Sequence, residues 1–498
     1  MIQASVEIAQ QFANAAKNKN DWGHLYNVRV YGAVGDGITD DTIAFQNAIS
    51  AAQKDDNGTV MIPSGTYIIS STLTITNRIG FIGMGMGQSI LQYIGTGFCL
   101  VFSTTYTGDP YWRIGDFNIQ SQTGSGIDAG GSGSLIVSNV SVTKPKPADQ
   151  GPNPVTGTIG IKLGAQSILV NSVIENIDLG VYIIGENVWV SDVYISICNT
   201  GMKLAAKSPY IYQTLFFKGN TGITTKGSGV SIVQIADCVF DTQNWYGIDI
   251  DSDCASWMLD NVWISNTAGD LTSAPPLVPS GMRFAPTRTV NNFWFSNCTF
   301  LNTQFGGHGF DCQTNLSGGH TFTGCAFSQN KGNGAKVDNI TSTSFTGCQF
   351  ALNGGYGVSG SNVSTLTFVG GHINSNTQGA FNLNANGYYA IGMSGLNPRG
   401  INPSGLPTSI TSGTEYQNTT GNFVTLYLPA YASVSGTNGD VLFNLGRNPG
   451  AGPFIRQFIP GSTDANRAHI CTLRIPPGYY FKVTTTGANL NNPQYVGE

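Results

Sequence analysis

The sequence has few charged residues, no surplus of basic side chains and no long apolar run. Asp, Glu, Lys and Arg make up 10% of the 498 residues, and the formal net charge is −5. A protein that binds nucleic acid through its phosphates needs a basic field, which this balance does not provide. No apolar stretch approaches the roughly 20 residues of a membrane-spanning helix. The sequence therefore predicts that the protein neither binds nucleic acid nor inserts into a membrane.

The nine cysteines lack the pairing that metal sites and disulfide frameworks show. Their number is odd, and no two of them stand in a C-x-x-C spacing. The first residues, 1–7 (MIQASVE), lack the basic and apolar layout of a signal peptide. These observations predict a chain made in a reducing cytoplasm, with free thiols in place of a disulfide column and with no metal or other cofactor.

What the sequence does have is 65 glycines, many of them in a repeating pattern. A Gly-apolar-x-apolar element recurs along the chain and predicts one short strand in every turn of a solenoid. For a chain of this length with so few charges, a repeating architecture fits better than one compact core. The element begins at Gly126, Gly160, Gly180, Gly201, Gly222, Gly247, Gly281, Gly309, Gly334, Gly357 and, less regularly, Gly379.

Two further strand patterns precede this element in the repeats. One is seen at residues 237–240 (DCVF) and 297–300 (NCTF), where alternate residues would point inward and stack cysteine and phenylalanine in columns. The other pattern comes before the cysteine-phenylalanine pattern in the same repeat, as at residues 344–346 (SFT). The pattern predicts three parallel strands per turn of roughly 20 to 25 residues. An asparagine ladder is expected at one turn position, at Asn266, Asn330, Asn353 and Asn376.

Residues 31–49 (YGAVGDGITDDTIAFQNAI) join a glycine turn to an amphipathic helix. Gly35 and Gly37 provide backbone freedom for the turn, Thr39 is the expected N-cap, and Asp40 and Asp41 lie where a helix dipole favours negative charge. We interpret these acids as capping residues. The motif resembles the entry segment of the pectate-lyase-like superfamily, in which such a helix plugs the open end of a right-handed parallel β-helix.

The predicted fold is all-β, a right-handed parallel β-helix with three strands per coil, an N-terminal capping helix and a small C-terminal antiparallel β-domain. Residues 1–24 are expected to form a helical attachment segment, residues 25–398 the capped β-helix, and residues 399–498 the C-terminal domain. A terminal β-domain protects the last coil from edge-to-edge pairing.

Within this superfamily, the sequence is similar to bacteriophage tailspikes, which need no export signal. The resemblance implies a virion protein that forms a homotrimer. Its N-terminus would attach to a phage tail or baseplate protein, and it would act at the outer surface of the host bacterium. A cellular carbohydrate enzyme whose export signal has been removed is the alternative.

The outward position of the Gly-apolar-x-apolar strand carries alternating charges in successive coils. It reads Asp249, Arg283, Asp311 and Lys336, on strands that lie about 4.8 Å apart. We interpret these residues as a solvated ladder that serves solubility and register, worth tenths of a kcal/mol per pair.

Two long connections, residues 143–158 and 266–280, are expected to wall a groove on one face. About four coils with short turns separate them, a distance of roughly 20 Å. A groove of this length would hold several sugar rings. Acids and flat aromatic faces on its surface would suit carbohydrate binding. Trp245 and Tyr246 have turn packing as their alternative role. The expected floor and lip residues are Glu175, Asp178, Lys218, Asp241, Trp245 and Tyr246.

Glycoside hydrolysis needs two carboxyl groups, one of them a proton donor. Asp237 and Asp260 are expected in the same register one coil apart, where like charge would raise one pKa. Turn capping is their alternative role. Asp241 with Glu175 is the competing pair, although three coils, roughly 14 Å, would separate their backbones. These four residues are the candidate catalytic groups.

Residues 307–309 (GHG) resemble a motif of polygalacturonase-type glycosidases and make His308 a candidate substrate-binding residue. The other elements of that signature are absent, because residues 199–201 read NTG and no paired aspartates follow. A lyase would need Ca²⁺ and a basic proton abstractor, and residues 249–253 (DIDSD) only superficially suggest a calcium loop.

The sequence thus predicts a tailspike-like depolymerase that binds and cleaves a bacterial capsule or O-antigen by hydrolysis. A polysaccharide lyase and a non-enzymatic glycan-binding tail adhesin are the alternatives.

Overall fold

The structure is a computed structural model. The attachment segment expected over residues 1–24 and the domain boundary expected at 398/399 lie outside its described residues, apart from His24. No helix among them is long and apolar enough to cross a membrane. The described residues are 24–55, 58–103, 112–145, 154–227, 229–314, 316–385, 388–391, 411–412, 414–417, 424–432, 439–446, 454–459, 469–475, 480–486, 488–490 and 494–497.

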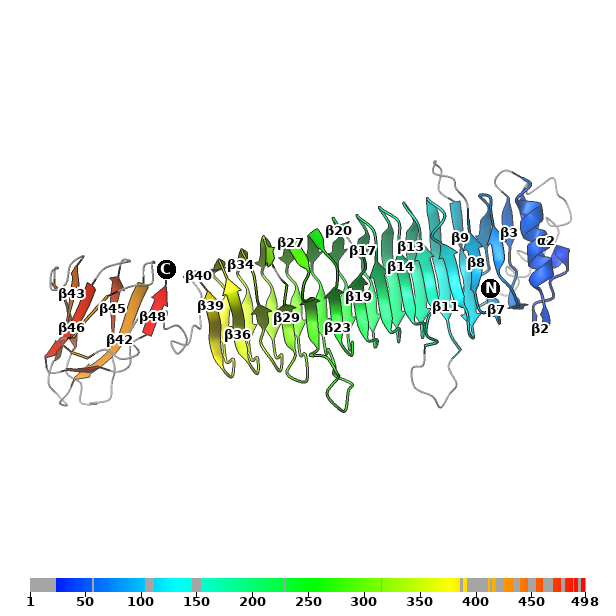
Figure 1. The fold of residues 1–498 in the computed structure, drawn as a ribbon. Coiled ribbons are helices and arrows are strands. Elements are labelled where there is room, and N and C mark those ends of the chain that lie inside the picture. Colours follow the sequence, from blue (N-terminus) through cyan, green and yellow to red (C-terminus); the bar gives the residue numbers. More distant parts are fainter. Residues whose placement is uncertain are drawn as a thin grey trace, which may run out of the picture. The chain divides into compact units, whose positions relative to one another are not determined.

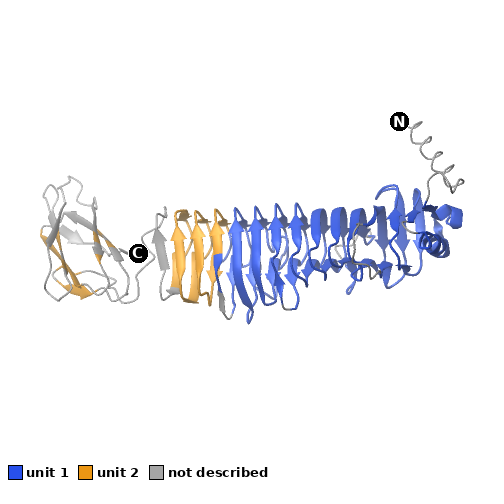
Figure 2. Ribbon diagram, turned by 90° about the horizontal axis from the view of Figure 1, so that it is seen from above, with its two compact units in different colours: residues 1–320, 330–332 blue, residues 321–329, 333–498 orange. Residues whose placement is uncertain are grey.

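The chain divides into two compact units. Unit 1 comprises residues 1–320 and 330–332, and unit 2 comprises residues 321–329 and 333–498 (Figure 2). Each unit contains turns of parallel β-structure, and unit 2 also contains antiparallel sheets.

Each regular turn of unit 1 contains three short parallel strands, which confirms the predicted repeat. One turn consists of β21 (Gln234–Ala236), β22 (Val239–Asp241) and β23 (Tyr246–Ile250), and the next begins at β24 (Cys254–Asp260). Corresponding strands pair in register from turn to turn (Figure 1). We call them first, second and third strands, in their order within a turn.

The third strands carry the glycine element and form one continuous parallel sheet within unit 1. A Cβ on Gly222 would lie 2.5 Å from the carbonyl oxygen of Gly247, so the glycine permits a close backbone approach. The glycine pattern missed the first two third strands, and Cys99 stands at the glycine position in one of them. The order is β5 (Leu73–Ile75), β8 (Phe98–Phe102), β10 (Ser125–Ala129), β12 (Ile159–Leu163), β14 (Leu179–Ile183), β16 (Thr200–Leu204), β19 (Thr221–Thr225), β23, β26 (Ser280–Phe284) and β29 (His308–Cys312).

First and second strands are continuous in four turns and separate in the others. The continuous strands are β9 (Trp112–Ser121), β11 (Leu135–Thr143), β13 (Ile168–Glu175) and β15 (Trp189–Ser196). The separate ones are β1 (Leu25–Asn27), β2 (Asp36–Asp40), β3 (Thr59–Met61), β4 (Gly65–Ile69), β6 (Gly80–Ile82), β7 (Ser89–Tyr93), β17 (Tyr210–Tyr212), β18 (Leu215–Phe217), β21, β22, β24, β25 (Trp263–Ser265), β27 (Thr289–Ser296) and β28 (Thr299–Leu301). Two additional short strands, β20 (Val230–Ser231) and β30 (Leu316–Gly318), pair with the starts of β24 and β27.

From β9 onward in unit 1, the bend between first and second strands is made by one residue with a positive φ in each turn. Asp and Asn tolerate this conformation, and their side chains can bond from turn to turn, as Asn139 Nδ2 does to Asp116 Oδ1 at 2.6 Å. We call this column the bend ladder. In unit 1 it comprises Asp116, Asn139, Asn171, Asp192, Gln213, Asp237, Asn261 and Asn297.

Cysteine and phenylalanine occupy interior columns, as predicted. Cys238 and Cys298 each donate from Sγ to the carbonyl two residues earlier and to a carbonyl of the preceding turn. The Phe216 and Phe240 rings stack at 4.5 Å with an interplanar angle of 4°. The described cysteines are all buried and free, which confirms the predicted thiols.

The expected asparagine ladder is correct except for Asn266. Asn353 and Asn376 bond to each other at 2.8 Å and follow a positive-φ residue, as Asn330 does. Asn266 instead has the positive φ itself, at 54°, so it lies one position earlier in its turn. A repeat read from the sequence alone cannot fix a one-residue offset in a loop that carries an insertion.

The N-terminal helix α2 (Thr42–Ala52) covers the end of the parallel strands (Figure 1). Phe45 is fully buried and lies 5.3 Å from the Tyr67 ring. The helix starts later than predicted, and Asp41 is its N-cap position in place of Thr39, which belongs to β2. Asp41 accepts the Val34 and Gly35 N–H groups, so it fastens the glycine turn. Asp40 accepts the Thr42 N–H at 3.0 Å, which confirms a capping role.

Unit 2 combines further parallel turns with a small antiparallel domain, as predicted. Its third strands are β33 (Ala335–Val337), β36 (Tyr356–Val363) and β39 (Gly379–Ala385). The antiparallel core is made of buried Leu, Val, Ile and Phe residues, with Leu426, Val441, Phe443 and Phe481 among them. Its strands are β41 (Glu415–Gln417), β42 (Val424–Ala432), β43 (Gly439–Gly446), β44 (Phe454–Ile459), β45 (His469–Ile475), β46 (Tyr480–Thr486), β47 (Ala488–Leu490) and β48 (Gln494–Gly497).

His320 gives unit 1 an expected sensitivity to acid. Its side chain packs against the Phe284 and Phe293 rings, and burial lowers its pKa to about 3. The unfolded chain takes up a proton below pH 6.5 while folded His320 stays neutral, so stability falls as the pH drops from 6.5 towards 3. Wild type should lose about 2 kcal/mol more than His320→Leu between pH 7 and pH 5.

Urea unfolding followed by tryptophan fluorescence measures this loss, because all seven tryptophans lie in residues 1–320. Equal losses in wild type and His320→Leu would show that His320 is not buried in its neutral form.

Candidate functional site

The outer face of the first and second strands carries large apolar side chains in adjacent turns. On this face Trp189 pairs with Tyr210, Met258 with Trp294, and Val239 with Trp263. They point outward because inward positions alternate with them along each strand. We call this surface the aromatic face. It comprises Trp189, Tyr210, Tyr212, Met258, Trp263 and Trp294, all in unit 1.

Trp189 forms the centre of an aromatic stack on this face. Its ring lies 5.0 Å from Tyr210 and 5.3 Å from Tyr212, with interplanar angles of 19° and 23°. Trp189 is nevertheless 44% exposed, so part of its ring surface faces solvent. A flat, exposed aromatic surface held by its neighbours is suited to stacking against another ring.

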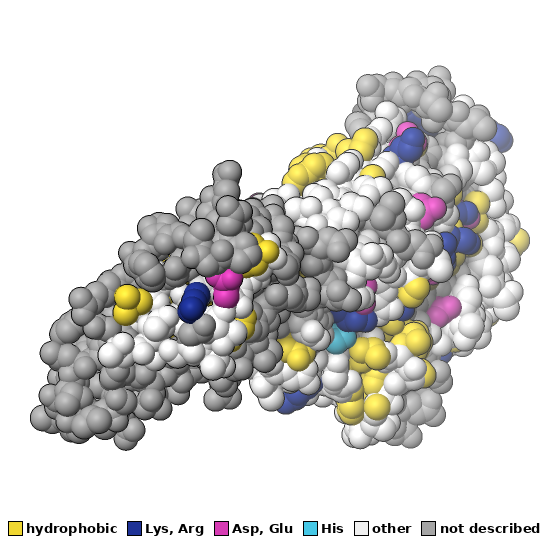
Figure 3. All heavy atoms as spheres, turned by 60° about the vertical axis from the view of Figure 1, so that its left-hand side comes forward, with side chains coloured by type: hydrophobic (Ala, Val, Ile, Leu, Met, Phe, Trp, Pro, Cys, Tyr) yellow, Lys and Arg dark blue, Asp and Glu magenta, His cyan; other side chains and the backbone are white. Residues whose placement is uncertain are grey.

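The C-terminal half of the aromatic face is equally exposed. Met258, Trp263 and Trp294 are 44%, 46% and 44% exposed. Figure 3 shows exposed hydrophobic side chains gathered in groups on a surface that is otherwise largely uncharged. Large exposed apolar side chains on neighbouring strands of one face mark an interaction surface.

Asp237 and Asp260 both lie exposed on the aromatic face, but not in the same register. Asp260 pairs with Ala236, and Asp237 aligns with Asn261 in the bend ladder. The expectation of equal register is wrong because the bend residue ends the first strand, one position after Ala236. The two are diagonal neighbours, and the Asp237 N–H donates to the Asp260 carbonyl at 3.1 Å.

Asp237 also takes part in the bend ladder. Its φ is 53°, and its Oδ1 accepts Asn261 Nδ2 at 2.6 Å. This contact supports the turn role that the sequence left open. The Asp237 side chain is exposed beside Asp260, and only one of its two carboxylate oxygens takes part in this hydrogen bond.

Asp241 and Glu175 stand in one outward column of the second strands, as expected, with Ser196 and Phe217 between them. Three turns therefore separate the two acids. The Oδ1 of Asp241 accepts hydrogen bonds from Asn266 at 2.7 Å and Ser265 at 3.1 Å. Asp241 and Glu175 are therefore too far apart to act as a catalytic pair of carboxyl groups.

Asp178 and Lys218 lie at the corner between second and third strands, where the groove was expected. Asp178 heads a separate asparagine ladder, accepting Asn199 Nδ2 at 2.6 Å, and it also accepts the Gly157 N–H at 2.7 Å. Lys218 Nζ lies 3.4 Å from Asp270 Oδ2 in the long connection after β25. Both side chains therefore fasten turns to one another.

Trp245, Tyr246 and His308 all lie at or near the start of third strands. Trp245 is half-buried beside its turn, and Tyr246 is only 3% exposed, so the packing role left open by the sequence applies to Tyr246. His308 pairs with Ser280 across third strands. The structure thus places these residues on a different sheet from Asp237 and Asp260.

The charge ladder on the third strands exists but is buried. Arg283 binds both carboxylate oxygens of Asp249, at 2.8 and 3.0 Å, and its guanidinium lies 4.1 Å from the Tyr246 ring centroid. Asp249 is 9% exposed and Asp311 is fully buried, so the expectation of a solvated ladder is wrong. Burial raises the pKa of Asp249, against the hydrogen bonds and charge of Arg283, which act to lower it.

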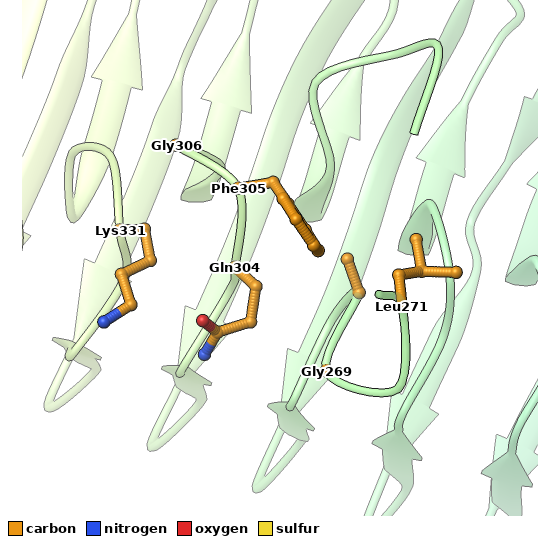
Figure 4. A pocket seen from close by; sticks show the side chains of 7 residues that line it. Gly269, Leu271, Gln304, Phe305, Gly306 and Lys331 are labelled. Atoms are coloured by element: carbon orange, nitrogen blue, oxygen red, sulfur yellow. The ribbon is translucent and has the colours of Figure 1, made fainter. Parts of the chain in front are cut away.

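A cavity of about 370 Å³ lies beside the long connection between β25 and β26. Phe305 points toward the Leu271 side of this cavity, and Gln304 and Lys331 line it from successive turns (Figure 4). The walled groove expected from the sequence lay on the N-terminal flank of this connection. The cavity lies on its C-terminal flank, toward residues 302–307.

Within the described ranges, no three His, Cys, Asp or Glu side chains gather closely enough to hold a metal ion. The acids at residues 249–253 have other partners. Asp251 pairs with Arg288 at 2.9 Å, and Asp253 accepts the Thr289 N–H at 2.8 Å.

Sequence reasoning missed the aromatic face and the cavity. The signal for the face was present, because Trp189 and Tyr210 occupy the same place relative to the bend ladder in consecutive repeats. The spacing between the Gly-apolar-x-apolar element and the first strand varies between repeats, so the glycine pattern does not align the first strands with one another. For the cavity, the signal was Phe305 before Gly306 and Gly307 in a turn.

Two family models match the chain. Residues 25–225 match the model described as rhamnogalacturonase A/epimerase, pectate lyase-like, and residues 281–394 match the right-handed β-helix region. The chain thus contains pectate lyase-like and right-handed β-helix domains, which confirms the resemblance read from residues 31–49.

Curated relatives match shorter stretches. The mannuronan C5-epimerase AlgE1 of Azotobacter vinelandii is 41% identical over 76 residues, 14% of this chain and 5% of that protein. The pre-neck appendage protein of Bacillus phage B103 is 31% identical over 121 residues, 23% of this chain and 14% of that protein. The matched stretches are thus a small part of these relatives' own length.

Solved structures with a similar fold include an epimerase module and a tailspike. The A-module of mannuronan C-5 epimerase AlgE6 from Azotobacter vinelandii has a TM-score of 0.49 at 16% identity, covering 74% of this chain and 98% of that one. Tailspike protein 3 of bacteriophage CBA120 has a TM-score of 0.43 at 12% identity, covering 81% and 67%.

Proposed function

We propose that this protein is a phage tail-associated depolymerase that binds host bacterial surface polysaccharide along the aromatic face and cleaves it beside Asp237 and Asp260. The single observation that carries the proposal is the presence of two exposed carboxylates on the same face as exposed, stacked aromatic rings. Sugar rings stack on such surfaces, and glycosidic cleavage needs two carboxyl groups near the scissile bond.

The aromatic face supports binding of an extended chain. Trp189 and Trp294 lie at its two ends, connected turn by turn through Tyr210, Gln234 and Met258. Four inter-strand steps of about 4.8 Å separate them, a length of roughly 19 Å. A rigid parallel sheet needs no ordering before it binds, which favours recognition of a repetitive polymer.

The carboxylate spacing supports hydrolysis. One inter-strand step and one residue along the strand separate Asp237 from Asp260, so their Cα atoms are about 6 Å apart. Side-chain rotation covers both the shorter separation of retaining enzymes and the longer one of inverting enzymes. Asp237 and Asp260 can therefore serve hydrolysis with either retention or inversion at the anomeric carbon.

The relatives support a polysaccharide as the target and a virion as the setting. The epimerases and the alginate lyase 7 of Azotobacter vinelandii are named for mannuronan and alginate, and the phage B103 relative is named as an appendage protein. We extend the phage setting to this chain, with a capsule or O-antigen as the polysaccharide and a homotrimer as the assembly.

Incubation with purified surface polysaccharides of candidate hosts, followed by size-exclusion chromatography, tests this function. Shortened chains with new reducing ends and no ultraviolet absorbance from unsaturated sugars are the expected result. Shortened chains with such absorbance would replace hydrolysis by β-elimination. Unchanged chains that remain bound to the protein would make it an adhesin, an outcome favoured by the contact between Asp237 and Asn261.

Trp189→Ala should weaken polysaccharide binding. Loss of the exposed ring removes about 0.5 to 1.5 kcal/mol of stacking, which corresponds to a Kd about 2- to 13-fold higher. Isothermal titration with a polysaccharide that wild type binds would measure the change. Ile38→Ala is the control, because Ile38 is 86% exposed and lies in β2, outside the aromatic face. Equal affinity of the Trp189 variant and wild type would remove the aromatic face from the binding site.

A further inference from the structure

The cavity on the C-terminal flank of the β25–β26 connection has a composition that suits one particular kind of ligand. It combines the apolar side chains of Leu271 and Phe305 with the amide of Gln304 and the ammonium group of Lys331. Its volume of about 370 Å³ is within the range of small-ligand sites. We propose that it is a subsite for one sugar ring that carries a carboxylate, so that the polysaccharide bound by this protein is acidic. This inference rests on the proposed function.

The walls of the cavity are preformed by backbone hydrogen bonds between successive turns. The Ala268 N–H donates to the Gln243 carbonyl at 2.6 Å, and the Gln304 N–H donates to the Thr267 carbonyl at 2.9 Å. The Lys331 N–H donates in the same way to the Thr303 carbonyl at 2.8 Å. Three stacked turns therefore hold the lining side chains in place before any ligand binds.

Phe305 is held in a costly conformation where it faces the cavity. Its φ is 51°, in the left-handed region that bulky residues avoid, and its side chain is 37% exposed. Neither the backbone strain nor the exposure of an aromatic ring stabilises the fold. Strain of this kind persists mainly where a side chain must be presented for a function, and here the function is an apolar face for a sugar ring.

Lys331 supplies the charge that selects an acid. No described carboxylate lies within ion-pair distance of its ammonium group, although the chain as a whole carries a net negative charge. The one acid of the neighbouring connection, Asp270, bonds to Lys218. Gln304 donates its amide to Asn302 Oδ1 at 2.6 Å, which fixes the side chain and leaves its carboxamide oxygen to accept a sugar hydroxyl.

The cavity is close to the aromatic face along the chain. Trp263 begins β25, and the connection that lines the cavity starts directly after Ser265, the last residue of that strand. Ala268, the first residue that lines the cavity, follows Trp263 by five residues, so the two lie at most about 17 Å apart along an extended strand. One polysaccharide chain can therefore contact Trp263 and place another of its sugar rings in the cavity.

Two variants test the two parts of the subsite. Lys331→Met keeps the side-chain length and removes the charge, whereas Phe305→Asn removes the ring and introduces a residue that tolerates a positive φ. The probes are hexamers of galacturonic, glucuronic and mannuronic acid, compared with neutral glucose and galactose hexamers, in isothermal titrations of the full chain. Lys54→Met, which removes an exposed lysine near the N-terminal helix, is the control.

We expect wild type to bind at least one acidic hexamer more tightly than the neutral ones, with an affinity that falls as salt is added. Lys331→Met should raise the Kd for that acidic hexamer about 3- to 10-fold and should remove most of the salt dependence. Phe305→Asn should raise the Kd about 3- to 10-fold while leaving the thermal midpoint unchanged or higher, a combination that a purely structural role would not produce.

Two outcomes would overturn this inference and leave the proposed function intact. They are tighter binding of the neutral hexamers, and equal binding of the acidic hexamer by Lys331→Met and wild type. If wild type binds neither these hexamers nor any host polysaccharide, the proposed function fails and the subsite fails with it.

Discussion

Substitution of Asp237 or Asp260 by Asn should abolish polysaccharide cleavage while leaving the protein folded. Removal of a positioned acid or base costs about 100- to 10,000-fold in rate, so either variant should fall close to background. The fold should tolerate Asn at position 237 because Asn261 and Asn297 already occupy the next two places in the bend ladder with φ values of 51° and 52°. Reducing-end release from a polysaccharide that wild type cleaves provides the rate.

Asp192→Asn is the matched control for this experiment. Asp192 is an exposed bend-ladder residue with a φ of 55°, two turns before Asp237. It has the same conformation and the same chemical change but no partner like Asp260 beside it. Full activity of the Asp237 and Asp260 variants would remove the catalytic assignment, whereas equal losses in all three variants would indicate a general effect of charge on this face.

Arg283→Met should strongly destabilise unit 1. It leaves Asp249, whose side chain is 12% exposed, without its partner, and breaking a buried ion pair in this way costs roughly 3 kcal/mol. Burial already raises the pKa of Asp249. The loss should therefore be smaller at acidic pH, where the folded state holds a proton on this carboxyl, and larger as the pH rises.

Two comparisons isolate the buried charge. The double variant Arg283→Met with Asp249→Asn removes both charges and should be more stable than Arg283→Met alone, as a double-mutant cycle would show. Arg288→Met breaks a pair with Asp251 whose side chains are 38% and 50% exposed, so its cost should stay within about 0.5 kcal/mol. Tryptophan fluorescence during urea unfolding reports all of these changes in unit 1. Equal losses at Arg283 and Arg288 would mean that burial does not decide the effect.

The sequence predicted most of the fold because the repeat specifies it locally. A glycine such as Gly222 is required wherever successive third strands approach closely, and Phe240 and Cys238 must alternate inward, so both leave a periodic trace. The first two third strands escaped because neither has the glycine: Cys99 replaces it in β8, and Thr72 stands at the corresponding position just before β5. The helix start was misplaced because Thr39 and Asp41 are equally good capping residues, and only tertiary pairing of β2 decides between them.

The site was harder to predict because it depends on the register between turns and on burial. A one-residue offset separated Asp237 from Asp260, and no periodicity in the sequence fixes where the bend residue ends a strand. Burial of Asp249 and Tyr246 depends on how Arg283 folds over its neighbours, which a pattern of alternating charge does not reveal. Residues of one column, such as Trp189 and Tyr210, were predictable in principle, since they keep a constant distance from the bend.

The bend ladder makes each turn of the solenoid an interchangeable module. Asp, Asn and Gln residues form the bend in unit 1, while Gly324, Gly347 and Gly370 form it in unit 2, so the geometry persists when the chemistry of the residue changes. Whole turns can accordingly be gained or lost during evolution without disturbing their neighbours, and each one lengthens the molecule by about 4.8 Å. The length of the β-helix is then set by the number of turns, independently of the ligand that any single turn binds.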